Sequence, residues 1–125
     1  MLLYITVGTN DLNRACRFYD AVMPCLGLER RFLNADEAGY GDPAPARIRF
    51  WVTRPFDGKP ASVGNGSMPA FIAPSRAAVD AFHAAGLATG GSDEGAPGLR
   101  PYGAGFYACY LRDPDGNKLS AVCEG

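Results

Sequence analysis

The sequence contains few of the residue combinations that carry out nucleophilic, acid–base or metal chemistry. The chain contains one histidine, His83, and no serine lies in a GxSxG setting, so neither a Ser–His–Asp nor a Cys–His arrangement is expected. His83 follows Phe82 on a predicted helix, which favours a surface or boundary position over a functional one. The cysteines show no CxxC spacing and lie in apolar runs, so we expect structural thiols at Cys16, Cys25, Cys109 and Cys123.

Arginines are the other candidates for chemistry, because a guanidinium that faces a partly dry site binds a carboxylate through paired hydrogen bonds. Arg47 and Arg49 alternate along a predicted strand and would therefore share a face. Arg100 and Tyr102 lie in a glycine-rich segment, residues 90–105, which we expect to be a loop that covers a site. That segment does not match a phosphate-binding loop, because it lacks the GxxxxGK[ST] pattern.

The elements of the first half must position these side chains. A β-rich run at residues 2–7 predicts a strand that stops at Gly8. Asp11 can cap a helix whose apolar side chains recur at spacings of three and four, and Pro24 and Gly27 bring that helix to an end. Further strands are expected at residues 28–33, near 39–41 and at 47–53.

The second half repeats this order after a polar connector at about 56–66. A strand is expected at 68–73, followed by a helix that Ser75 caps and Gly86 ends. Shifting the first helix by 64 positions, from Asp11 to Ser75, also places Phe18 on Phe82, which indicates a duplicated unit.

A hairpin with the turn DPDGN closes the chain, between strands at 106–112 and 118–123. A four-residue turn at 113–116 would place Cys109 opposite Ser120. A three-residue turn with a bulge at Gly116 would place Tyr110 there instead.

Composition limits the function classes. The chain has 125 residues, one domain's worth, with 47% hydrophobic and 20% charged residues. Its net charge of −1 does not indicate a positively charged surface of the kind that binds nucleic acid. No stretch approaches the roughly 20 apolar residues of a membrane span, and no signal peptide is recognised. We therefore expect a cytoplasmic protein with a small-molecule partner and neither a nucleic-acid nor a membrane partner.

Motifs at both ends of the chain resemble those of the vicinal oxygen chelate superfamily, which contains glyoxalase I, the bleomycin resistance proteins and the extradiol dioxygenases. They are the pattern DL-x(5)-FY-x(6)-LGL from Asp11 to Leu28 and the turn DPDGN at 113–117. The resemblance implies an α+β fold of two βαβββ modules that form a half-open mixed β-barrel with outer helices, and a homodimer. The modules would span about 1–55 and about 67–125 of a single domain.

In metal-dependent members of that superfamily, His, Gln or Glu side chains on the inner sheet faces hold one divalent ion. By position, the resemblance places these ligands at Tyr4, Met68 and Ser120, none of which is a usual metal ligand. No cofactor is therefore expected. A divalent metal would need noncanonical ligands, such as Tyr4 with Glu37 or Glu124.

The remaining inner-face residues describe a small-molecule site, which is mostly apolar with a few polar groups. Phe50 or Trp51, and Tyr107 or Tyr110, would lie near the former ligand positions. The predicted binding residues are Tyr4, Arg49, Trp51, Met68, Arg100, Tyr102, Tyr110 and Ser120. The hypothesis is a metal-free protein that binds a small organic molecule. The alternative is a lyase or dioxygenase-type enzyme that uses unusual metal ligands or Tyr4 as an acid–base group.

Overall fold

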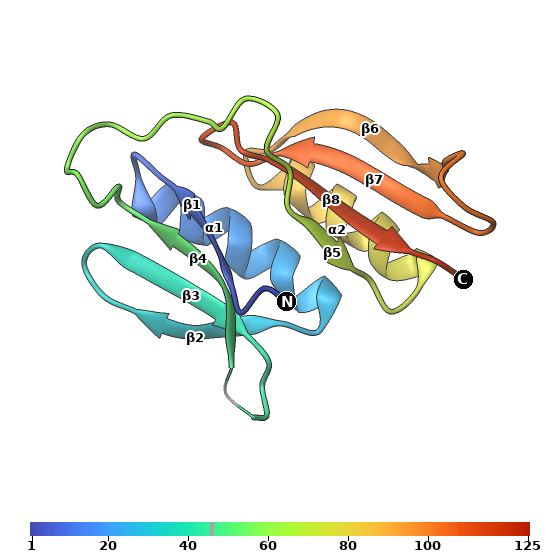
Figure 1. Cartoon of the computed structure of the whole chain (residues 1–125), viewed down its shortest axis with the longest axis horizontal. Helices are drawn as coiled ribbons and strands as arrows, with labels where there is room; N and C mark the ends of the chain where they lie inside the picture. The colour runs from blue at the N-terminus through green and yellow to red at the C-terminus, as the bar shows by residue number, and fades with distance from the viewer. Residues whose placement is uncertain (46) are drawn as a thin grey trace.

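Each half of the chain folds into one strand, one helix and three further strands (Figure 1). The computed structural model describes residues 1–45 and 47–125. The first module consists of β1 (Ile5–Gly8), α1 (Leu12–Val22), the short 3-10 helix η1 (Met23–Leu26), β2 (Glu29–Leu33), β3 (Glu37–Gly41) and β4 (Ile48–Thr53). The second consists of β5 (Ala70–Ile72), α2 (Arg76–Ala88), β6 (Ser92–Leu99), β7 (Tyr107–Arg112) and β8 (Lys118–Cys123).

The two sheets have the same topology. Their strand orders are β1-β4-β3-β2 and β5-β8-β7-β6, with β1 parallel to β4, β5 parallel to β8, and all other pairs antiparallel. The sheets lie side by side and are not closed into one barrel, and the two helices cover the same side of the molecule (Figure 1). The predicted α+β class with two mixed βαβββ modules is confirmed.

The helices begin where the sequence predicts. The side chain of Asp11 accepts a hydrogen bond from the Arg14 amide, and Ser75 does the same for Ala78, so both are N-caps. The equivalent side chains Phe18 and Phe82 are both fully buried. Because α1 and α2 pack against each other, the two modules share one core.

The largest correction concerns residues 90–105, which are not one long loop. Ser92–Leu99 form the edge strand β6, which pairs with β7 through two register shifts. Glycines and a proline are tolerated in an edge strand with bulges, and these residues are also the usual signals of a loop.

Two predictions on the second helix are also wrong. Gly86 does not end α2, which continues to Ala88; a β-carbon at Gly86 would lie 2.6 Å from Leu111 Cδ1, so the glycine permits close packing. His83 is only 8% exposed, and its Nε2 lies 2.8 Å from Asp93 Oδ1 on β6. The histidine therefore joins α2 to β6 beneath the surface.

The turn at 113–117 connects the second module to the first. The buried Tyr19 hydroxyl donates to Asp113, at 2.5 Å, and Asn117 Nδ2 donates to the Gly8 carbonyl. Asp115 accepts from the Thr9 hydroxyl at 2.6 Å, and also from the Asn10 amide and Arg14. Because these bonds join residues about a hundred positions apart, the turn holds the modules in register.

Candidate functional site

The side of each sheet away from the helices is open, and register decides which side chains lie on it. Phe50 is fully buried against the helices, so the neighbouring Trp51 lies on the open face. On β7, the Tyr107 hydroxyl donates to Asp80 of α2, and Tyr110 is on the opposite face. Trp51 and Tyr110 are therefore the open-face members of the two pairs that the sequence left unresolved.

The hairpin alternative is also resolved. Tyr110 pairs with Ser120, as the three-residue turn requires, and Gly116 has a φ of 94°. Ser120 is fully buried, and among the described residues its Oγ has no hydrogen-bond partner.

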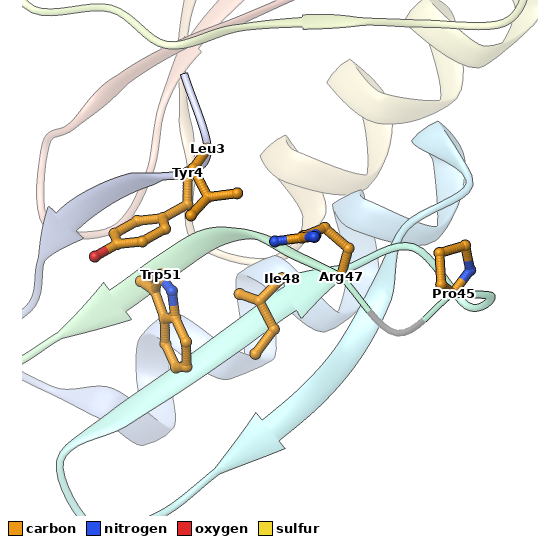
Figure 2. A pocket seen from close by; sticks show the side chains of 6 residues that line it. All are labelled: Leu3, Tyr4, Pro45, Arg47, Ile48 and Trp51. Atoms are coloured by element: carbon orange, nitrogen blue, oxygen red, sulfur yellow. The ribbon is translucent and has the colours of Figure 1, made fainter. Parts of the chain in front are cut away.

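A cavity of about 330 Å³ lies on the open face of the first sheet (Figure 2). Tyr4, just before β1, and Trp51 of β4 both line it, together with Ile48 and Arg47. Trp51 also packs edge-on against Phe32, with 5.6 Å between ring centroids. Most of the wall is therefore apolar, with a phenol and a guanidinium as its polar groups.

A larger cavity, of about 520 Å³, lies between the edge strands of the two sheets. Its walls are residues 2–7 on one side and 67–71 on the other, with Arg49 at one end. Tyr4 lines both cavities, and Met68 lines only this one. The volume is within the range of about 300–1,000 Å³ that is typical of small-molecule sites.

The two arginines of the first module line different cavities. Gly41 pairs with Ile48 and Tyr40 with Phe50, so Arg49 is the extra residue of a β-bulge. Arg47 lines the smaller cavity. Arg49 lines the larger one, where its Nε donates to Asp42 at 2.9 Å.

The other predicted residues lie on the second sheet. Arg100 is half-buried, with its guanidinium carbon 5.3 Å from the centroid of the Tyr110 ring. Tyr102 is 72% exposed and packs edge-on against Phe106, so it lines neither cavity. Four of the predicted residues therefore line two adjoining cavities: Tyr4, Trp51, Arg49 and Met68. Arg100, Tyr110 and Ser120 line neither of them.

The positions that the resemblance assigns to metal ligands do not form a metal-binding set. Tyr4 is half-exposed, Met68 carries a thioether, and the hydroxyl of Ser120 is fully buried. Within residues 1–45 and 47–125, no three His, Cys, Asp or Glu side chains converge as a metal site would require.

The noncanonical ligand set is not assembled either. Glu37 pairs with Thr53 and Ile5 with Phe50, so Tyr4 and Glu37 lie near opposite ends of β4, roughly 13 Å apart along the strands. Glu124 follows β8 and lines another cavity, with Ile72 and Phe106, which Tyr4 does not line.

Comparison with known proteins agrees with this architecture. The family model of the Glyoxalase/Bleomycin resistance protein/Dioxygenase superfamily matches residues 1–120. The chain belongs to this superfamily. No curated protein matches it.

Solved structures of the family superpose on most of the chain. A glyoxalase/bleomycin resistance protein from Albidiferax ferrireducens T118 is 42% identical, with a TM-score of 0.88, over 99% of this chain and 98% of that one. A lactoylglutathione lyase from Agrobacterium tumefaciens is 22% identical, with a TM-score of 0.66, over 98% and 92% of the two chains. A fosfomycin resistance protein from Listeria monocytogenes is 18% identical, with a TM-score of 0.67, over 100% and 93%. The last two show the shared fold alone.

Several lining residues were missed at the sequence level. Leu3 and Ile48 line the smaller cavity, and the bulge at Arg49 is what places Ile48 beside Trp51. Lys118 lies on the open face of the second sheet, 5.8 Å from the Tyr110 ring centroid. Its alternation with Ser120 along β8 could have identified it. In the described part of the chain, no helix is both long and apolar enough to cross a bilayer.

Proposed function

We propose that this protein binds a small, mainly apolar organic molecule in the cavities around Tyr4, without a resident metal. The observation that carries this proposal is the large cavity between β1 and β5, whose walls are largely apolar and hold no set of metal ligands. Burial of a ligand's apolar surface there would supply the binding energy.

The chain offers a direct readout, because Trp51 is its single tryptophan and lines the smaller cavity. Titration with the neutral probe 1-naphthol should quench Trp51 fluorescence to saturation. Tyr4→Ala should weaken this binding about tenfold, since roughly 1–2 kcal/mol of ring contact is lost. Tyr102→Ala is the matched control and should leave the affinity unchanged. An equal effect of both variants would contradict the assignment of the cavity.

The metal-free part of the proposal needs its own experiment. Protein purified without chelators should hold well below one equivalent of Mn, Fe, Co, Ni or Zn per chain by elemental analysis. One tightly held ion per chain, lost together with 1-naphthol binding after chelation, would overturn it.

A second role for the smaller cavity is general acid–base catalysis by Tyr4, which Arg47 favours because both side chains line that cavity. Tyr4→Phe keeps the aromatic ring and removes the phenolic hydroxyl that would donate or accept the proton. Conversion of a bound molecule, followed by NMR, should then slow by about a hundredfold or more while affinity is retained. Equal conversion by the variant would exclude this role.

We also propose that a second copy of the chain covers the open faces. Ile72 is 88% exposed and Leu3 54%, which is unusual for large apolar side chains on one side of a molecule. Light scattering should give twice the chain mass, and Ile72→Lys should shift the protein toward the monomer. A monomeric parent protein would contradict this assembly.

A further inference from the structure

Three half-buried side chains meet on the open face of the second sheet: Arg100, Tyr110 and Lys118. The Arg100 guanidinium carbon lies 5.3 Å from the centroid of the Tyr110 ring, and Lys118 Nζ lies 5.8 Å from the same centroid. Both distances are within the range of a cation–π contact. One aromatic ring thus contacts two cationic side chains, one from the end of β6 and one from β8.

The backbone of β6 is shaped to hold this arrangement. A β-carbon at Gly95 would lie 2.9 Å from Tyr110 Cδ2 and 3.2 Å from Arg100 Nη2, and one at Gly98 would lie 3.1 Å from Arg100 Nη1. Arg100 Nη2 also donates to the Ala96 carbonyl at 2.7 Å. Two glycines and a carbonyl therefore fix the guanidinium over the ring instead of leaving it in solvent.

Neither of the two cations is paired with a carboxylate of the described residues. In the described ranges, 1–45 and 47–125, neither Arg100 nor Lys118 forms an ion pair. Arg112 lies on the same face, but it is paired with Glu94 at 2.7 Å. Because half-buried cations are usually paired, the uncompensated charge indicates a place for an anion.

A row of paired residues connects this place to the large cavity. Ala70 pairs with Ser120, Ser120 with Tyr110, and Tyr110 with Gly95, so the row crosses the whole sheet. Ala70 lines the cavity at one end, and Arg100 lies above Gly95 at the other. Ser120, in the middle of the row, carries the buried hydroxyl without a hydrogen-bond partner in the part of the chain that the structure describes.

We propose that Arg100 and Lys118, held over Tyr110, bind the oxyanion of a small molecule, either a carboxylate or a phosphate. The guanidinium donates to the oxyanion, the ammonium adds a second charge-assisted hydrogen bond, and the Tyr110 ring keeps both cations in place. This site goes beyond the proposed function, since it shares no side chain with the cavity around Tyr4 and Trp51.

The probes are benzoate, inorganic phosphate and neutral benzamide at constant ionic strength, followed by the backbone amide shifts of Tyr110 and Lys118 in NMR. Benzoate or phosphate should bind in a saturable manner and benzamide should not. A preference for benzoate identifies a carboxylate site, and a preference for phosphate identifies a phosphate site. Lys118→Met should weaken binding about tenfold, as expected for one lost charge-assisted hydrogen bond.

Lys59→Met is the matched control, because it removes the same charge from the connector and should not change the affinity. Gly95→Ala should displace Arg100 and also weaken binding, whereas Gly103→Ala, whose new methyl group meets only Phe106 Cβ at 3.9 Å, should not. If benzoate and phosphate do not bind, or if Lys59→Met weakens binding as much as Lys118→Met, the inference is wrong. Quenching of Trp51 by 1-naphthol would persist in that case, which separates this failure from failure of the proposed function.

Discussion

On the first sheet the open face places Trp51 against Gly39, and on the second it places Tyr110 against Gly95. A β-carbon at either glycine would lie 2.9 Å from the ring that packs on it. The surroundings of the rings differ, because Trp51 has the apolar neighbours Ile48 and Phe32, whereas Tyr110 has cations. The shared topology thus decides where an aromatic ring lies, and the adjoining side chains decide which chemical group it would meet.

The helix sides of the two modules show the opposite relation, because their chemistry is alike. Phe18 and Phe82 occupy equivalent positions and are both fully buried. The modules are also joined by bonds from the 113–117 turn, so the common core and the turn make them one unit. The predictions below test how far this equivalence extends.

The largest effect is expected from Phe18→Ala and Phe82→Ala. Each should lower the free energy of unfolding by about 3–5 kcal/mol, since each leaves a cavity in the shared core. Urea denaturation followed by circular dichroism should show one transition for both variants. Phe56→Ala, in an exposed part of the connector, is the control and should change the free energy by less than about 0.5 kcal/mol. Two separate transitions would show that the modules unfold independently.

The connection between the modules is tested by Asp115→Ala. The Asp115 side chain is 3% exposed and accepts hydrogen bonds from Thr9, Asn10 and Arg14. Its removal should cost about 2–3 kcal/mol of unfolding free energy, because the buried Thr9 hydroxyl loses its acceptor and two further hydrogen bonds are lost. Asp57→Ala removes an acceptor used only within an exposed loop and should be near neutral. Equal losses for both variants would argue against a connecting role of the turn.

Two aspartates of the second module should affect the pH dependence of stability with opposite signs. The hydrogen bond with His83 lowers the pKa of Asp93, so its stabilising contribution is present above the usual aspartate pKa and is lost as the pH falls through the lowered value. Burial raises the pKa of Asp113, so its contribution is present at low pH and is lost as the pH rises through the raised value.

Thermal denaturation from about pH 3 to pH 7 separates these contributions. Asp93→Asn should reduce the loss of stability at the acid end. Asp113→Asn should flatten the decline that begins above the usual aspartate pKa of about 4. The slopes are compared, since both substitutions also change hydrogen bonds. Parallel slopes for the parent and both variants would contradict the two assignments.

Local signals predicted much of this fold because they act within a few residues. Asp11 and Ser75 cap their helices as expected, and Gly27 ends η1 with a φ of 77°. The same reasoning failed at Gly86. The sequence alone does not distinguish a glycine required for close contact with Leu111 from a glycine required for a turn. β6 was missed for a similar reason, because the glycines and the proline that occur in an edge strand with bulges are also typical of loops.

The candidate site was predictable in composition but not in arrangement. Tyr4, Trp51 and Met68 line cavities. The resemblance singled out Tyr4 and Met68, and alternation along β4 places Trp51 on the face opposite to Phe50. The bulge at Arg49 shifts the pairing of β3 and β4 by one residue, and no local sequence pattern predicts such a shift. Arg47 and Arg49 line different cavities. The contact between Arg100 and Tyr110 depends on pairing between β6 and β7 and therefore on the whole sheet.

The smallest effect is expected from Gly39→Ala. The added methyl group would approach Ile48 Cδ1 at 2.8 Å and Trp51 Cζ3 at 2.9 Å, which are distal atoms that can move aside at a cost of about 1 kcal/mol. Trp51 emission should then shift to longer wavelength, because the displaced ring meets more solvent. The affinity for 1-naphthol should fall with it, while Gly103→Ala leaves both unchanged. An unaltered emission spectrum in Gly39→Ala would mean that the glycine does not position the ring, and the parallel between Gly39 and Gly95 would fail with it.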